Sequence, residues 1–345
     1  MNDLDEEATG LRIALDAMGG DSAPQVVVQG ALLACQLFPT VELVLVGDEE
    51  AIRSCMPQPS PPSLRIQPTT EVIGADEEPA MAIRRKKDSS LVVAVQMMVR
   101  GEVDAMVTAG NTGAFMAAGT LLVGRMAGVS RPALGPILPT SDHRGVLVLD
   151  GGANMDAKPE HLVQYAWMGH CYAREVSGIA EPRIGLLNVG TEPAKGNELS
   201  KAVYPLLQAM PLNFVGNVEA RDVPRGVADV LICDGFAGNI LLKSIEGTAD
   251  FLFDVLRREM TGSLIGRLGA LILRSRLKKI KDDMNYNEYG GAPLLGVQGV
   301  MMKCHGSSDP LAIRNGVKQA IKAVERGLVQ GIQDSVSRVE VKHVT

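Results

Sequence analysis

The sequence predicts an α/β fold with a mostly parallel sheet, and two features of the chain carry this prediction. Short apolar runs rich in β-branched residues recur along the chain, and glycine-containing segments bound them. Nearly all of these runs are followed by a stretch with the periodicity of a helix, as expected for parallel strands connected by helices. Ligands bind at the carboxyl ends of the strands in such open sheets, so we expect one shared polar site there.

The predicted elements alternate along the chain. Buried strands are expected at 11–15, 41–46, 64–66, 105–108, 146–149, 184–189, 230–232 and 300–302. Helices are expected at 23–38, 79–100 with a break at 88–90, 112–124, 159–177, 198–210, 239–260, 264–282 and 310–327. Two of these helices follow each other without a strand between them, which predicts a helical hairpin, 243–285, that projects from the sheet.

The composition is that of a globular protein. The chain has 345 residues, of which 46% are apolar and 21% charged, enough to bury one large core or two smaller ones. Its net charge of −6 argues against a general nucleic-acid binder. The five cysteines are scattered and form no Cys-x-x-Cys pair, which indicates neither a disulfide framework nor a zinc site and favours a reducing compartment.

The two ends of the chain are expected to lie outside the fold. We expect a single α/β domain at 11–331, preceded by a disordered acidic leader, 1–10, and followed by a flexible polar tail, 332–345. The first residues are acidic where a signal peptide is basic and then apolar, and no run is long enough to span a bilayer. The sequence therefore predicts a cytoplasmic protein.

Several common catalytic motifs are missing, whereas anion-binding segments are present. The chain contains no P-loop, no G-x-S-x-G elbow, no H-E-x-x-H and no G-x-G-x-x-G after the first strand. Three segments lie between a strand end and a helix start, where free N–H groups and the helix dipole favour an anion. These segments contain Asn111, Thr112 and Gly113, then Gly238 and Asn239, then Ser307, Ser308 and Asp309. Each alone is typical of an ordinary N-cap, but three at one sheet edge predict a phosphate or carboxylate site.

Two further polar residues lie just beyond predicted strand ends. Lys195 lies in a loop rich in Gly and Pro, and it is either a solvated surface lysine or a mobile cation for a phosphate. His305 is the only histidine at a predicted strand end, and it is either a structural residue or an acid or base. Asp234 and Asp309 occupy similar positions.

A set of uncommon strings gives the chain a family resemblance. They are DAMGGD (16–21), DEEP (76–79), RRKKDSS (84–90), AGNTGA (109–114), KGNE (195–198), DGFAGN (234–239), EYGGAPLLG (288–296) and HGSSD (305–309). In this order they resemble the PlsX family, the bacterial acyl-acyl carrier protein:phosphate acyltransferases, over about residues 11–328. The loop before Lys195 departs from the family pattern, because Glu192 alone remains where the family often carries several acidic residues.

The resemblance implies a fold, a reaction and partners. The fold is a three-layer α/β/α sandwich, related to the isocitrate-dehydrogenase-like and phosphotransacetylase-like proteins, in a cytoplasmic homodimer. The reaction moves a long-chain fatty acyl group from acyl carrier protein to inorganic phosphate and forms the acyl phosphate used in phospholipid synthesis. No cofactor and no metal ion are expected.

The resemblance also implies roles for individual residues. Lys195 and Asn239 match positions that the family is thought to use in catalysis. Phosphate is itself the nucleophile, so the protein must hold this anion against a thioester and stabilise the tetrahedral oxyanion. Lys195 would hold phosphate or the developing charge, Asn239 would donate to the thioester oxygen, and His305 would protonate the departing thiolate. Phosphate or substrate would be bound by Asn111, Thr112, Gly113, Asp234, Gly238, Ser307 and Ser308.

Two surfaces are candidates for larger partners. The cations Arg84, Arg85, Lys86 and Lys87 predict a docking surface for the acidic carrier protein, with a solvated helix face, or arginines turned inward to phosphate, as the alternatives. A helical stripe flanked by basic residues predicts peripheral binding to the anionic inner face of the cell membrane, with a core or dimer contact as the alternative. The stripe consists of Leu264, Ile265, Leu268, Leu271 and Ile272.

Two other functions stay open from the residues alone. A metal-dependent NAD dehydrogenase of the related fold would need clustered carboxylates, for which Asp16, Asp21 and Asp234 are present, and a nucleotide site, for which no motif is present. A noncatalytic membrane scaffold would need only the projecting helices.

Overall fold

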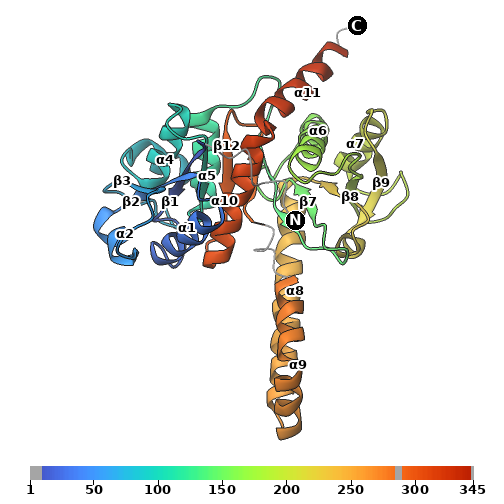
Figure 1. Cartoon of the computed structure of the whole chain (residues 1–345). Coiled ribbons are helices and arrows are strands. Elements are labelled where there is room, and N and C mark those ends of the chain that lie inside the picture. The colour runs from blue at the N-terminus through green and yellow to red at the C-terminus, as the bar shows by residue number, and fades with distance from the viewer. Residues whose placement is uncertain (1–9, 284–289, 343–345) are drawn as a thin grey trace.

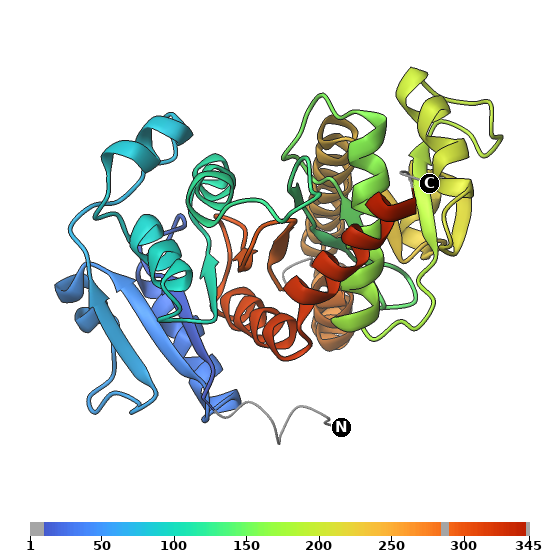
Figure 2. The same ribbon diagram turned by 90° about the horizontal axis from the view of Figure 1, so that it is seen from above.

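The computed structural model describes residues 10–283 and 290–342 and contains two sheets of mostly parallel strands (Figures 1 and 2). The predicted α/β class with a mostly parallel sheet is confirmed. Residues 1–9 of the predicted leader, the last residues of the predicted hairpin segment, and Glu288 and Tyr289 of the EYGGAPLLG string lie outside the described residues.

The first sheet has seven strands in the order β3-β2-β1-β4-β12-β11-β5. They are β1 (Arg12–Asp16), β2 (Glu42–Gly47), β3 (Leu64–Pro68), β4 (Ala105–Thr108), β5 (Ala133–Leu134), β11 (Ala292–Leu295) and β12 (Val300–Lys303). The strands from β3 to β12 pair in parallel, and β11 pairs antiparallel with both of its neighbours.

The second sheet has five strands in the order β6-β7-β10-β8-β9. They are β6 (Ile137–Leu138), β7 (Val146–Leu149), β8 (Ile184–Asn188), β9 (Phe214–Glu219) and β10 (Val230–Ile232). Only the short edge strand β6 pairs antiparallel in this sheet.

The single strand edge that we expected from the sequence is thus divided between two sheets, and the division falls at Gly135-Pro136. Gly135 donates its N–H to Pro293 of the first sheet, and the carbonyl of Pro136 accepts from Val148 of the second sheet. Because proline has no N–H to continue a ladder, the chain leaves one sheet and enters the other at this point.

Helices cover both faces of the sheets. Residues alternate along β1, so that Ile13 and Leu15 join the core on the side of α1 while Ala14 joins the core on the side of α4. The helices are α1 (Gln25–Leu37), α2 (Glu49–Cys55), α3 (Pro79–Arg85), α4 (Ser90–Val99), α5 (Thr112–Ala118), α6 (Pro159–Glu175), α7 (Glu198–Gln208), α8 (Gly235–Thr261), α9 (Leu264–Asp283), α10 (Pro310–Glu325) and α11 (Leu328–Lys342). This layering agrees with the predicted α/β/α sandwich.

The helices α8 and α9 form the predicted hairpin and project well away from the sheets (Figure 1). The buried residues of α8 are Gly235, Gly238 and Leu241, all in its first two turns. The base of α8 is therefore fixed to the second sheet, whereas the rest of the hairpin extends beyond it. Within the described residues, no helix combines the length and the apolar character that crossing a bilayer requires.

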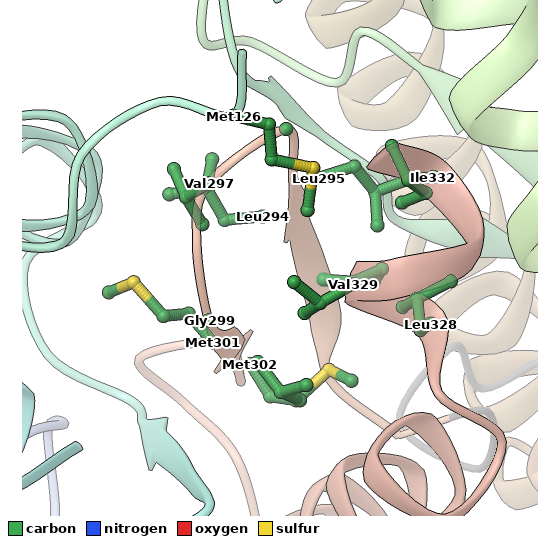
Figure 3. A pocket seen from close by; sticks show the side chains of 13 residues that line it. Met126, Leu294, Leu295, Val297, Gly299, Met301, Met302, Leu328, Val329 and Ile332 are labelled. Atoms are coloured by element: carbon green, nitrogen blue, oxygen red, sulfur yellow. The ribbon is translucent and has the colours of Figure 1, made fainter. Parts of the chain in front are cut away.

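The C-terminal segment differs from its prediction. Residues from 332 on were expected to form a flexible tail, but the structure continues there as α11, which packs against α6. Leu328, Ile332 and Val336 recur every four residues and are 1–3% exposed, so one face of α11 is part of the core. Figure 3 shows Leu328 and Ile332 in a small apolar cluster with Met126 and Leu295. The period of these apolar residues is the signal that predicts this helix.

Candidate active site

Three polar loops meet at the carboxyl ends of β1, β4 and β12, which are neighbours in the first sheet. The N–H of Asp21, in the loop after β1, donates to the carbonyl of Gly306, in the loop after β12, at 2.8 Å. A Cβ at Gly19 would lie 2.6 Å from the backbone nitrogen of Gly110, in the loop after β4. Glycine is therefore required at position 19 for these loops to approach each other.

A second group of polar loops meets at the carboxyl ends of β7 and β10, in the second sheet. The N–H of Gly235 donates to the carbonyl of Asn154 at 2.9 Å. A Cβ at Gly152 would lie 2.9 Å from Nδ2 of Asn239. The loop after β7 therefore lies directly against the first turns of α8.

The loop after β7 is organised by the buried side chain of Asp150. Its carboxylate accepts hydrogen bonds from the N–H groups of Leu134, Gly152, Ala153 and Asn154 and from the amide of Asn154, at 2.6–3.1 Å. These hydrogen bonds fix the conformation of the loop that contains Gly152, against which the side chain of Asn239 lies.

A pocket of about 140 Å³ lies between the two groups of loops, and we call it the inter-sheet pocket. Residues of both sheets line it, among them Thr112, Gly151, Leu242, Glu246, Lys303 and His305. This pocket therefore lies between two sheets, whereas the sequence predicted a site along one sheet edge.

Asn239 lies in the second turn of α8, because the helix begins at Gly235. Leu242 and Glu246 follow Asn239 at three and seven residues, so they share its face of the helix, and this face borders the inter-sheet pocket. The partly buried Asn239 is therefore placed to present its amide next to this pocket.

A larger apolar space lies on the neighbouring face of α8. Phe236, Ile240 and Ser244 line both a pocket of about 470 Å³, which includes Asn239, and an adjoining pocket of about 430 Å³. The second pocket is walled mainly by apolar residues and extends to Leu162, Leu186 and Leu199. We call the two together the apolar groove, and Asn239 lies where this groove approaches the inter-sheet pocket.

Lys195 has an exposed side chain in the loop between β8 and α7. Its N–H donates to the carbonyl of Glu192 at 3.0 Å, and its carbonyl accepts from the amide of Asn188 at 3.0 Å. The next two residues, Gly196 and Asn197, line the apolar groove, whereas Lys195 lines neither the groove nor the inter-sheet pocket. The backbone of Lys195 is held in place beside the groove, and its side chain is solvated.

His305 lines the inter-sheet pocket, with its ring held by the loop that follows it. Nδ1 of His305 accepts from the N–H of Ser307 at 3.2 Å and lies 2.8 Å from Oγ of the same residue. In a neutral ring whose Nδ1 accepts, the proton is on Nε2, whereas in the charged ring Nδ1–H donates to Oγ of Ser307. Glu246 lines the same pocket, and burial raises the pKa of its carboxyl while the charge of His305 opposes this rise.

The predicted anion donors at Ser307 and Ser308 are engaged inside their own loop. The N–H of Ser307 donates to Nδ1 of His305, and the N–H of Ser308 donates to the carbonyl of His305 at 3.1 Å. Their backbone N–H groups are therefore not open to an anion in this structure. The hydroxyl of Ser308, by contrast, is buried and has no hydrogen-bond partner among the described residues.

The predicted anion donors at the start of α8 are also engaged locally, within the helix itself. The N–H of Gly238 donates to the carbonyl of Asp234 at 3.0 Å as an ordinary helical hydrogen bond. The carboxylate of Asp234 accepts from the N–H of Ala237 at 2.7 Å, so this residue is the N-cap of α8. The sequence predicted that this helix begins at residue 239, but it begins four residues earlier, at Gly235. Asp234 and Gly238 therefore stabilise the first turn of the helix.

Asn111 is also an N-cap, and it has a second role. Its side-chain oxygen accepts from the N–H of Ala114 at 3.0 Å, and its amide donates to the carbonyls of Gly74 and Ala75 at 3.2 and 2.9 Å. A Cβ at Gly113 would lie 2.6 Å from Cγ of Pro79. Asn111 and Gly113 thus join the loop before α3 to the pocket wall, and Thr112 lines the pocket.

The structure shows a row of three buried polar residues, of which only Asp16 was singled out from the sequence. Asp16, Thr108 and Lys303 are paired in register across β1, β4 and β12. The hydroxyl of Thr108 donates to Asp16 at 2.7 Å, and burial raises the pKa of the Asp16 carboxyl. Lys303 is 7% exposed, and burial lowers its pKa to about 8. A polar residue that directly ends a fully buried strand is the sequence signal for all three.

The basic run at the end of α3 is exposed except at one position. Lys86 is partly buried, and its ammonium donates to Glu77 at 2.6 Å and to the carbonyl of Val72 at 2.7 Å. Arg84, Arg85 and Lys87 are exposed. Three cations of the run are therefore available to a partner. Lys86 instead helps to fix the loop before α3, to which Asn111 also donates hydrogen bonds.

The apolar stripe on α9 is exposed where its side chains are described. Ile265, Leu268, Leu271 and Ile272 are 60–85% exposed, and the side chain of Leu264 lies outside the described ones. On α8, Phe251, Leu252 and Leu256 are also exposed. The hairpin thus presents apolar surface on both of its helices.

Known proteins with similar sequences cover almost the whole chain. The chain is 56% identical over 328 residues to a phosphate acyltransferase of Brevibacillus brevis, which covers 95% of this chain and 98% of that relative. It is 51% identical over 328 residues to a phosphate acyltransferase of Halalkalibacterium halodurans, which covers 95% and 97% of the two chains.

Two solved phosphotransacetylases have a similar fold. One from Streptococcus pyogenes superposes with a TM-score of 0.58 at 15% identity, over 92% of this chain and 95% of the other. The EutD phosphotransacetylase from Staphylococcus aureus gives a TM-score of 0.56 at 14% identity, over 92% and 96%. At these identities the likeness shows the fold, and it agrees with the phosphotransacetylase-like fold that the motifs imply.

The model of one protein family spans most of the described fold. The family described as "Fatty acid synthesis protein" matches residues 11–331, which include both sheets and the hairpin. Together with relatives above 50% identity, this match confirms the resemblance that the motifs gave. The chain belongs to this fatty acid synthesis family, the PlsX family, and is a phosphate acyltransferase.

Proposed function

We propose that this phosphate acyltransferase takes its long-chain acyl group from acyl carrier protein and that Asn239 and Lys195 stabilise the transition state. One observation carries the proposal most directly. Asn239 lies on α8 between an apolar groove, suited to an acyl chain, and a small pocket lined by charged residues, suited to phosphate.

The reaction needs no acylated side chain. An oxygen of phosphate attacks the thioester carbonyl carbon, and the carbonyl oxygen becomes an oxyanion. The C–S bond then breaks, the carbonyl re-forms as an acyl phosphate, and the departing thiolate takes a proton. The protein has to align the two substrates and stabilise the oxyanion.

The site residues divide these tasks. The amide of Asn239 donates to the oxyanion, and the loop of Asp150 and Gly152 fixes its position. Lys195 supplies a mobile cation from a loop whose backbone is held beside the groove. His305 protonates the thiolate as an imidazolium: Nε2 gives up its proton, and Nδ1–H donates to Oγ of Ser307 and stays protonated in the neutral ring that remains.

The acyl chain occupies the apolar groove in this proposal. The volume of about 430 Å³ beside Phe236 and Ile240 lies within the usual range of ligand pockets. Burial of each methylene contributes about 0.8 kcal/mol, which gives a long-chain substrate an advantage over a short one.

The carrier protein docks on Arg84, Arg85 and Lys87 in this proposal. Arg84 and Arg85 end α3 and Lys87 follows it, and the loop before α3 is joined to the pocket wall by Asn111. An acidic carrier held there is therefore close to the site. Complementary charge raises the association rate, and this effect weakens with salt.

The exposed hairpin supports two further parts of the proposal. The apolar residues of α8, Phe251, Leu252 and Leu256, suit contact with a second copy of the chain in a homodimer. The apolar stripe of α9 and its basic neighbours suit peripheral binding to an anionic membrane surface at the inner face of the cell membrane. An acyl phosphate formed there is released close to the enzymes that use it.

Product analysis tests the proposal. The purified protein should convert palmitoyl-acyl carrier protein and phosphate to an acyl phosphate that hydroxylamine traps, without added metal or nucleotide. Consumption of the thioester that requires NAD or ATP would overturn it. A protein that binds liposomes but turns over no thioester would be the scaffold alternative.

A further inference from the structure

The inter-sheet pocket contains a buried lysine that the roles given above do not use. Lys303 ends β12, is 7% exposed and lines the pocket with His305 and Glu246. Its ammonium donates to the carbonyl of Cys304. An ammonium has three N–H donors, so two remain without an acceptor among the described residues.

The charges around Lys303 do not neutralise it by direct contact. Asp16 and Asp21 act on it electrostatically, but no described carboxylate forms an ion pair with it. The carboxylate of Asp16 already accepts from Thr108 at 2.7 Å and from the N–H of Met18 at 3.3 Å. A buried charge without a close partner is costly, so an anion in this pocket would be stabilised strongly.

The adjoining loop contains a second buried polar group without a partner among the described residues. The hydroxyl of Ser308 is buried, and it has no hydrogen-bond partner among the described residues. Ser308 lies in the loop that leaves β12 directly after Lys303 and Cys304. Buried hydroxyls are nearly always hydrogen-bonded, but Ser308 does not line the inter-sheet pocket, so its hydroxyl is not counted as a ligand there.

We propose that the inter-sheet pocket is the binding site of inorganic phosphate and that Lys303 is its buried cation. The inference rests on phosphate acyl transfer, and it adds the location of the nucleophile. The pocket has room for several water-sized groups, and Leu242 and Glu246 line it from the face of α8 that Asn239 shares, so a phosphate on Lys303 would lie near the proposed position of the thioester.

Glu246, on the α8 side of the pocket, gives the site a preference among anions. A monohydrogen phosphate still carries one hydroxyl hydrogen, which it can donate to the carboxylate of Glu246. Sulfate has no such hydrogen at neutral pH, so one of its negatively charged oxygens would face the carboxylate of Glu246 and be repelled by it. The site should therefore favour phosphate over sulfate, and sulfate should compete poorly.

Steady-state kinetics of Lys303→Met test the assignment. The KM for phosphate should rise roughly tenfold or more, the scale of one lost charge-assisted hydrogen bond, whereas the KM for the acyl thioester should stay nearly unchanged. Lys322→Met is the matched control, because Lys322 is also a partly buried lysine but lies on α10 and does not line the pocket. An unchanged KM for phosphate in a folded Lys303→Met variant would overturn the inference.

A measurement on the unaltered protein covers the case in which the variant does not fold. Reductive methylation followed by peptide mass spectrometry should show that phosphate protects Lys303 while the labelling of Lys322 stays the same. Sulfate should protect much less. Normal turnover without protection of Lys303 would refute the phosphate site and leave the proposed function standing. Protection without any acyl phosphate formation would support the site and refute the proposed reaction.

Discussion

The side-chain amide of Asn239 lies directly against Gly152: a Cβ at position 152 would be 2.9 Å from Nδ2 of Asn239. The φ angle of Gly152 is +135°, a backbone conformation that side chains rarely permit. The loop after β7 and the base of α8 therefore fix the position of the proposed oxyanion donor together.

Gly152→Ala should reduce kcat strongly, because the new Cβ would displace the Asn239 amide and strain the loop. A shift of about 1 Å in a catalytic group costs on the order of a hundredfold in rate. Gly247→Ala is the matched control, since a Cβ at that position of α8 meets nothing within 4 Å. We expect the control to keep its activity and to be slightly more stable in thermal unfolding. Equal activity of both variants would disprove the positioning role of Gly152.

Lys195→Ala and Asn239→Ala should each lower turnover with little change in the melting temperature. Removing one oxyanion donor typically costs about a hundred- to a thousandfold in kcat. Lys201→Ala, an exposed lysine on α7, serves as the control for Lys195 and should keep full activity. A parallel loss of stability and activity in the two site variants would mean that both residues are structural.

Charge reversal on α3 should weaken the use of acyl carrier protein. Arg84→Glu combined with Lys87→Glu should raise the KM for the acyl carrier substrate and flatten its dependence on salt, because steering by exposed charge is screened by ions. Lys86 is left intact, since its ion pair with Glu77 holds the neighbouring loop. Kinetics between low and high salt measure the effect, and unchanged values would remove α3 from the docking surface.

Leu268→Glu combined with Ile272→Glu should abolish sedimentation with anionic liposomes and leave turnover of carrier-bound substrate largely intact. Both side chains are exposed on α9, and each basic residue near an anionic surface adds about 1 kcal/mol, so binding should also weaken with salt. Leu37→Glu combined with Val99→Glu alters exposed apolar residues elsewhere and should leave liposome binding unchanged. If the α9 variant unfolds or becomes monomeric, the stripe is a core or dimer contact instead.

The sequence predicted the alternation of strands and helices well, because period and glycine boundaries are local properties. Residues 105–108, 146–149 and 230–232 form strands with the predicted bounds. The division into two sheets was not predictable in this way, since it depends on which strands pair across long sequence distances. Its local cause, Gly135-Pro136, lies between two strands of two residues each that carry almost no periodic signal.

The candidate site was predictable at the level of loops and less so at the level of atoms. The strings around Asn111, Asn239 and His305 do come together around the inter-sheet pocket. The N–H groups of Gly238, Ser307 and Ser308 are engaged locally, which no motif reveals. Lys303 escaped notice because it directly precedes a polar loop, where a lysine looks solvated, and only the packing of β12 between β4 and β11 buries it.

The central claim is that phosphate attacks the thioester directly at this site, and an acyl-exchange measurement tests it most directly. The protein is incubated with palmitoyl-acyl carrier protein and isotopically labelled carrier protein that bears a free thiol, first without phosphate and then with it. We predict no transfer of palmitate to the labelled carrier until phosphate is added, because the acyl group has no other acceptor on the enzyme. Exchange at a comparable rate without phosphate would reveal an acylated side chain and contradict the account.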